Sequence, residues 1–114
     1  MPKVKKEQPK NDFFTAFIKS EMDLIFEKEF KFLENRRFRF DYANHKYKIV
    51  IEKEGGIWRK GGGAHSRPSG IERDIEKYTL AAVEGWIIIR RQPKQMLTIQ
   101  TISLIRKAIE SRKN

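Results

Sequence analysis

The spacing of hydrophobic residues near the start of the chain predicts a helix. It follows Asp12, a residue type that commonly caps helix N-termini. The apolar side chains at roughly helical spacing are Phe13, Phe14, Phe17, Ile18 and Met22. Residues 1–11 are instead rich in Lys, Pro, Gln and Asn and have almost nothing to bury. They predict a mobile basic arm that precedes a single domain over residues 12–114.

Alternating apolar and polar positions follow this helix and predict strands. Residues 27–43 alternate on both sides of Glu34 and Asn35, which favours two strands joined by a turn. Residues 48–54 continue the alternation and predict a third strand. The second and third strands are expected to pair as an antiparallel hairpin.

A long loop and a second helix come next. Residues 55–70 hold six of the seven glycines and predict a long cationic loop. Ser69 and Glu72 fit a capping box, and Gly85 is placed to end the helix. The apolar stripe of this helix consists of Ile71, Ile75, Tyr78 and Ala82.

The last third of the chain predicts a strand and a helix. Residues 86–91 (WIIIRR) form a continuous apolar run, typical of a strand covered on both faces. A strand, a helix and a strand in this order favour a right-handed crossover with parallel pairing. Ile102, Ile105 and Ile109 mark a final amphipathic helix with a basic outer face. Together the elements predict an α/β fold, with a mixed sheet of about four strands flanked by helices.

The charge balance points to a polyanionic partner. Lys and Arg number 25 against 15 Asp and Glu, a net charge of +10 in 114 residues. Long-range attraction and counterion release favour nucleic acid, and a merely soluble basic protein is the plain alternative. The absence of cysteine excludes disulfides and thiolate zinc sites. Because no run of about 18 apolar residues is present, we expect no membrane partner and a cytoplasmic location.

Carboxylates lie on the strands where a core would be expected. A four-residue loop over 44–47 would place Asp41 opposite Val50 and diagonal to Glu52. One face of the hairpin would then carry Phe40, Tyr42, Ile49 and Ile51. The other would carry Asp41, Glu52 and Glu54. Three close carboxylates repel one another unless a cation lies among them, and oxygen ligands suit Mg²⁺ or Mn²⁺. The pattern predicts a metal site for phosphodiester hydrolysis.

The competing interpretation gives these acids a plain surface role. Glu52 and Glu54 would be solvated residues of an edge strand that form ion pairs with Arg37 and Arg39 on the same face. Acids on strands are common, so spacing by itself leaves both interpretations open. A basic protein of ribosomal or RNA-chaperone type is a third possibility, for which no acid cluster is expected.

Five motifs occur in a fixed order: RRFRFDYA, KIVIEKEGGIW, GGGAHSRPSG, IERDIEKYTLAAVEGW and IIIR. In this order they resemble the PD-(D/E)XK nuclease superfamily. The resemblance is to small phage and bacterial endonuclease-like proteins related to very-short-patch repair endonucleases, and it covers about Glu29 to Arg91. It implies a restriction-endonuclease-like core and a Mg²⁺-dependent DNA endonuclease acting in repair or recombination on branched or damaged DNA. A homodimer is a state often found among such small members.

The resemblance also implies the site residues. Asp41 and Glu52 match the metal-binding acids, and Glu54 completes or flanks the site. Glu54 stands where the family pattern has lysine, and Lys77 on the second helix is the preferred replacement. His65 matches the loop histidine, which would hold a phosphate or transfer a proton.

Each of these assignments has a plainer alternative. Lys77 could form an intrahelical ion pair with Asp74, and His65 could be an incidental loop residue. Glu29, which precedes the basic strand, could reach the metal. Because the motif lysine is missing, a nuclease-derived nucleic-acid-binding module without catalysis is the main competing function.

Cationic and aromatic residues near the proposed site predict DNA contacts. They are Arg36, Arg37, Arg39, Trp58, Arg59, Lys60 and Arg67. Such a mixture can bind a phosphate backbone and stack a base or sugar. The alternative for Trp58 is cover for a hydrophobic edge, and for Trp86 core packing is expected.

Overall fold

The computed structural model of the chain describes residues 11–55 and 68–113. The elements are α1 (Phe13–Met22), β1 (Glu27–Lys31), β2 (Arg39–Asn44), β3 (Ile49–Lys53), α2 (Pro68–Val83), β4 (Ile87–Arg91), the 3-10 helix η3 (Pro93–Gln95) and α3 (Ile99–Lys113). Within the described ranges, the strands form one four-stranded sheet in the order β1-β2-β3-β4. Neighbours are antiparallel except β3 and β4, which are parallel. The predicted α/β class, mixed sheet and parallel crossover are therefore confirmed.

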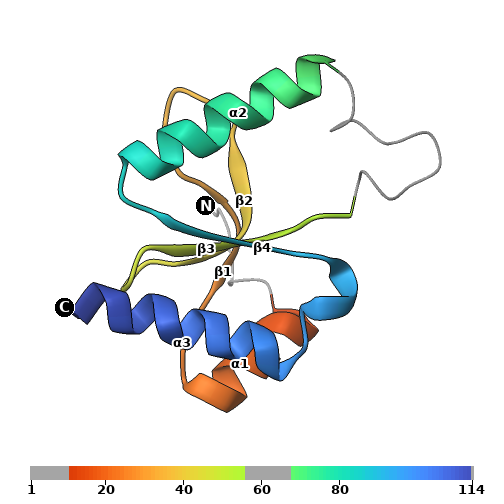
Figure 1. Cartoon of the computed structure of the whole chain (residues 1–114), viewed down its shortest axis with the longest axis vertical. Coiled ribbons are helices and arrows are strands. Elements are labelled where there is room, and N and C mark those ends of the chain that lie inside the picture. The colour runs from red at the N-terminus through yellow and green to blue at the C-terminus, as the bar shows by residue number, and fades with distance from the viewer. Residues whose placement is uncertain (1–10, 56–67, 114) are drawn as a thin grey trace, which may run out of the picture.

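The sheet lies between two helical layers. Figure 1 shows α2 on one side of the strands and α1 with α3 on the other. We call the side toward α1 and α3 the apolar face and the side toward α2 the charged face. The apolar face holds the larger core cluster, which consists of Phe14, Ile18, Phe26, Tyr42, Ile49, Ile51, Ile89, Met96, Ile102, Ile105 and Ala108. The predicted amphipathic α3 is confirmed by the burial of Ile102 and Ile105 in this cluster.

Asp12 joins α1 to the sheet. Its side chain accepts a hydrogen bond from the Thr15 N–H at 2.9 Å and caps the helix, as the sequence predicts. The Tyr42 hydroxyl of β2 donates to Asp12 Oδ2 at 2.5 Å, and Lys28 Nζ of β1 lies 3.3 Å from the same oxygen. Burial opposes the effect, but these hydrogen bonds lower the pKa of Asp12. One carboxylate thus holds a helix start and two strands.

The charged face has a smaller apolar cluster. Phe40, Ala43, Val50 and Ala81 are its buried members, and partly buried aromatic residues surround them. Trp86 is one of these and lies 5.5 Å from Phe30 between ring centroids. The prediction that Trp86 packs in the core is confirmed.

The faces of β2 differ from the prediction. Tyr42 lies on the apolar face with Ile49 and Ile51, as expected, but Phe40 lies on the charged face. The alternation of side chains between the two faces is interrupted at Glu29 of β1. This residue lies between the pairs Lys28–Tyr42 and Phe30–Phe40 and has a left-handed φ of 55°. The prediction of one shared face is wrong for Phe40.

The hairpin register between β2 and β3 also differs. Val50 pairs with Ala43 and not with Asp41, because residues 45–48 form the connection and Lys48 has a left-handed φ of 54°. The observed register differs from the predicted one by an even number of residues, so each side chain of β3 stays on its predicted face. Its consequence is that Asp41 falls in register directly with Glu52, not diagonal to it.

Helix α2 begins at Pro68, one residue before the predicted cap Ser69. It ends at Val83, and Gly85 follows with a φ of 92°, the left-handed conformation expected of a glycine at a helix end. No helix in residues 11–55 or 68–113 is long and apolar enough to cross a membrane.

The predicted apolar stripe of α2 does not all face the sheet. Ile71 and Ile75 are 47% and 62% exposed, and Ala82 is exposed, whereas Ala81 is fully buried. The helix is turned by about one residue, roughly 100°, so that Lys77 faces the sheet. The stripe prediction fails because a buried charged contact, and not apolar burial alone, sets the rotation of this helix.

Candidate functional site

Asp41 and Glu52 lie side by side across β2 and β3. The Asp41 N–H donates to Glu52 Oε1 at 3.2 Å, and the Lys53 N–H donates to Asp41 Oδ2 at 2.7 Å. Asp41 and Glu52 lie next along the two strands after the paired residues Tyr42 and Ile51. Their side chains accept hydrogen bonds from backbone N–H groups that would otherwise bond to the neighbouring strand. The strand pair opens here around two carboxylates.

Glu52 is buried and paired with a cation. Only 6% of the residue is exposed, on a strand whose three preceding residues are apolar and buried. Lys77 Nζ of α2 contacts Glu52 Oε2, and the Tyr78 hydroxyl lies 3.3 Å from the same oxygen. Burial raises the pKa of Glu52 to about 7, with a further upward contribution from the Asp41 charge, while Lys77 opposes the shift. This carboxyl therefore titrates near neutral pH.

Glu54 has a different set of partners. Its Oε2 accepts from Arg90 Nε at 2.8 Å and from the Tyr78 hydroxyl at 3.3 Å. The Arg90 guanidinium also lies 4.5 Å from the centroid of the Tyr78 ring. Burial raises the pKa of the Tyr78 hydroxyl, and the charges of Glu52 and Glu54 raise it further, so Tyr78 stays protonated and can donate to both carboxylates.

A row of cations extends from Glu52 along α2. Lys77 Nζ lies 4.7 Å from the centroid of the Phe40 ring. One turn earlier on the helix, Arg73 lies 4.8 Å from the Phe38 ring, and Arg36 lies 4.4 Å from the same ring. The aromatic side chains of β2 and its preceding residues thus support positive groups at the end of the sheet that carries the carboxylates.

Arg36 also forms an ion pair with Glu76. Arg36 Nη1 lies 2.7 Å from Glu76 Oε2, and this hydrogen bond raises the pKa of Arg36. Arg73 Nη2 lies 3.4 Å from the Arg37 carbonyl oxygen, a long contact between the first half of α2 and the β1–β2 connection. Arg37 and Arg39 are exposed. Of the predicted DNA-binding arginines that are described, Arg36 therefore belongs to the row of cations, and Arg37 contacts it through its carbonyl oxygen.

The structure brings some of the predicted site residues together. Asp41, Glu52 and Lys77 meet, as expected, because Glu52 contacts both the Asp41 N–H and Lys77 Nζ. Across the described part of the chain, no group of three or more His, Cys, Asp or Glu side chains is arranged to hold a metal ion. The two-carboxylate pair fits Mg²⁺, which is commonly bound by one or two carboxylates and completes its shell with water and phosphate.

The remaining predicted residues have other positions or partners. Glu29 is exposed on β1, and the register of β1 with β2 places it opposite Asp41. The ion pairs that the competing interpretation gives to Glu52 and Glu54 do exist, but with Lys77 and Arg90 in place of arginines near the start of β2. Five candidate residues fall outside the described ranges: Trp58, Arg59, Lys60, His65 and Arg67.

Sequence reasoning missed three contributors: Arg73, Tyr78 and Arg90. Tyr78 follows Lys77 directly, but its place in an apolar stripe concealed its hydroxyl. The predicted crossover places β4 beside β3 but leaves the register open, and this register sets Arg90 opposite Glu52. Alternation then puts it on the same face as Ile88.

Comparison with protein-family models, with curated proteins and with solved structures gave no match. The resemblance to the PD-(D/E)XK superfamily therefore stays a prediction that depends on the motifs quoted above.

Proposed function

We propose that this chain is a metal-dependent DNA endonuclease that hydrolyses phosphodiester bonds, with branched or damaged DNA as its substrate class. The observation that carries the proposal is the meeting of Asp41, Glu52 and Lys77 from β2, β3 and α2 on one face of the sheet. These are the two acids and the replacement lysine that the resemblance implies. A mixed sheet flanked by helices, with the acids on adjacent strands, agrees with the implied core.

Asp41 and Glu52 are the groups that would hold Mg²⁺ or Mn²⁺. Their adjacency brings two negative charges together in a partly dehydrated place, which makes a cation favourable there. The metal ion, when bound, polarises a phosphodiester as a Lewis acid. Glu54 supports the site through Tyr78, whose hydroxyl contacts both Glu52 and Glu54.

Lys77 supplies a fixed positive charge beside these acids. Its side chain is 12% exposed, so the ammonium is largely shielded from water. Held by Glu52 and by the Phe40 ring, it is placed to donate a hydrogen bond to a phosphate oxygen or to a nucleophilic water. A lysine is the expected residue for this role. In this chain it comes from α2 and not from the strand that carries Glu52.

The cations around these residues support DNA as the polymer that the chain binds. Arg36, Arg37 and Arg73 lie around the Phe38 end of the row, and the chain as a whole carries a net charge of +10. Such a surface binds the phosphate backbone without reading base edges. Recognition by backbone and shape suits branched or damaged DNA better than a specific sequence.

The test is cleavage of supercoiled plasmid and of branched and mismatched DNA in Mg²⁺ or Mn²⁺, with an EDTA control. Asp41→Asn and Glu52→Gln are expected to reduce cleavage to the background of protein-free DNA. Glu72→Gln, which changes an exposed carboxylate on α2, is the matched control and keeps full activity. Circular dichroism of each variant separates lost chemistry from lost folding. Wild-type cleavage rates in both site variants would reject the assignment.

The second candidate is a nucleic-acid-binding module without catalysis. Lys77 and Arg90 already neutralise Glu52 and Glu54, so the carboxylates have charge partners without a metal ion. Calorimetric titration with Mn²⁺ distinguishes the two functions. The endonuclease requires a binding site that disappears in Glu52→Gln, whereas the module binds DNA and shows no such site.

A further inference from the structure

The outer edge of β4 presents backbone groups that no described residue pairs with. β4 is the last strand in the sheet order. The Ile87 N–H donates to the Lys48 carbonyl, and the Arg91 carbonyl accepts from the Glu54 N–H, so these residues turn their backbone groups toward β3 and its end. Alternate residues of a strand point their backbone groups to opposite edges. Ile88 and Arg90 therefore direct their N–H and carbonyl groups outward.

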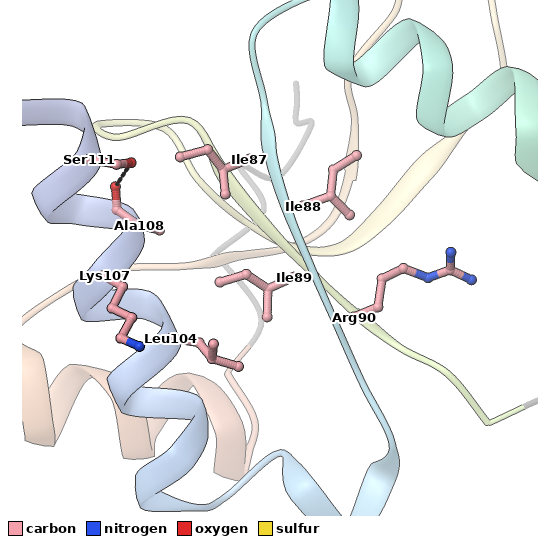
Figure 2. A pocket seen from close by; sticks show the side chains of 8 residues that line it. All are labelled: Ile87, Ile88, Ile89, Arg90, Leu104, Lys107, Ala108 and Ser111. Atoms are coloured by element: carbon pink, nitrogen blue, oxygen red, sulfur yellow. Dashed lines mark hydrogen bonds between the residues drawn. The ribbon is translucent and has the colours of Figure 1, made fainter.

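Grooves lie on both sides of this edge. Figure 2 shows Ile87 and Ile89 pointing toward α3, where they line a groove of about 460 Å³ with Leu104 and Lys107. In the same view, Ile88 and Arg90 point to the other side of the strand.

On the side of α2, a second groove of about 480 Å³ lies between the helix and Arg90, and the exposed Ile71 and Ile75 form part of its wall. An added strand would direct successive side chains alternately into the two grooves. The displaced stripe of α2 is thereby explained as one wall of a binding surface.

We propose that the free edge of β4 binds β4 of a second copy of this chain, antiparallel and about a twofold axis, to form one continuous sheet. Twofold pairing requires a surface that is complementary to itself. With Ile88 opposite Ile88 of the other copy, the outward backbone groups of the two residues bond each other, and an apolar pair lies at the centre.

The charges around this pairing are complementary. In that register, Arg90 of one copy lies opposite Trp86 of the other, just before β4, and Glu84 lies two residues earlier in the turn that follows α2. Glu84 is exposed just before β4, and Arg90 is exposed near its end. Antiparallel pairing therefore brings the acidic start of each strand to the basic end of the other, whereas a parallel arrangement would align like charges.

The opposite edge of the sheet is not built for such pairing. β1 has the sequence EKEFK, with exposed charged residues at Glu27, Glu29 and Lys31. Glu29 also has a left-handed φ of 55° in the middle of the strand. Charge and irregular backbone are devices by which proteins block edge pairing. Of the two sheet edges in the described ranges, only β4 is suited to pairing, so association stops at a dimer.

The test is sedimentation and light scattering of the full chain over about a hundredfold range of micromolar concentrations. The wild type is expected to show a monomer–dimer equilibrium. Ile88→Lys places two like charges opposite each other at the centre and is expected to weaken the dimer at least about tenfold. Because Ile88 is partly buried, Glu84→Lys, a change at an exposed residue, provides a second variant whose folding is not at issue; it sets like charges near Arg90 and weakens the dimer less.

Ile99→Lys and Glu110→Lys are the matched controls, since both residues are exposed on α3 away from β4. They are expected to leave the dimer unchanged. The proposal is overturned by a wild type that stays monomeric, by species larger than a dimer, or by equal dimer affinities in the β4 variants and the controls. None of these results bears on DNA cleavage, so the endonuclease proposal stands or falls separately.

Discussion

The two faces of the sheet are stabilised in different ways, although the same strands form both. On the apolar face, Ile18, Ile51 and Ile105 are completely buried among other apolar side chains. On the charged face, next to Ile51 in sequence, Glu52 is almost as deeply buried but contacts Lys77 and Tyr78. The first arrangement gains stability from burial alone, whereas the second must offset the cost of dehydrating charges with specific partners. The two faces therefore stabilise one sheet by different means, apolar burial on one side and paired charges beside a smaller apolar cluster on the other.

The largest effect on stability is expected from the apolar face. Ile105→Ala removes a fully buried side chain between α3 and the sheet. The lost burial and the cavity should lower the free energy of unfolding by about 2–5 kcal/mol. Urea unfolding followed by circular dichroism measures this change. Ile99→Ala, which truncates an isoleucine that is 76% exposed on the same helix, is the control and should cost less than about 1 kcal/mol.

The contribution of the charged face to the free energy of unfolding is expected to depend on pH. Burial holds the pKa of Glu52 at about 7 in the folded state, against 4.5 for an ordinary glutamate. Between these values the folded protein keeps a proton that the unfolded chain has lost, so the stabilising contribution is complete below pH 4.5 and is lost as the pH rises through 7. Glu52→Gln cannot titrate and removes this dependence.

Urea unfolding of both proteins at about pH 5 and about pH 8 tests this prediction, and the variant should gain roughly 2–3 kcal/mol relative to the wild type at the higher pH. Carboxylates that do not contact residue 52 contribute equally to both proteins and cancel in the difference. A difference that does not change with pH would contradict the buried, proton-holding state of Glu52. Ile105→Ala, in contrast, should lower stability by similar amounts at the two pH values.

The smallest effect is expected for the hydroxyl that links the two carboxylates. Tyr78→Phe keeps the ring against Arg90 but removes 3.3 Å contacts to Glu52 and Glu54. Unfolding experiments should show a loss of about 1 kcal/mol. NMR titration of the Glu52 carboxyl carbon should show a higher pKa, because one donor to its charged form is gone. An unchanged titration would mean that Tyr78 does not act on Glu52.

The elements were predictable because each follows a simple periodicity. The helix start at Asp12, the burial of Ile102 and Ile105 and the parallel crossover to β4 depend on local spacing and on general rules of connection. The meeting of Asp41 with Glu52 was predictable for the same reason, since an even loop keeps the faces of a hairpin strand whatever its exact register.

What sequence could not supply were the irregular backbone positions and the choice of partners. Glu29 and Lys48 adopt left-handed φ values without being glycine, and they set the faces of β2 and the register of β3. The rotation of α2 depends on Lys77 reaching a buried carboxylate, which periodicity alone does not encode. Arg90 required the three-dimensional pairing of β4 with β3 before it could be matched to Glu54.

The shared carboxylate of Asp12 has a mechanical consequence. The same oxygen receives the Tyr42 hydroxyl and faces the Lys28 ammonium, so α1 cannot shift along the sheet while both contacts hold. Tyr42 directly follows Asp41, which connects any loosening of the first helix to the strand that carries the site. A local opening that begins at α1 would therefore reach Asp41 and Glu52 through the Tyr42 hydroxyl as well as through the packing of Phe14 against the Tyr42 ring.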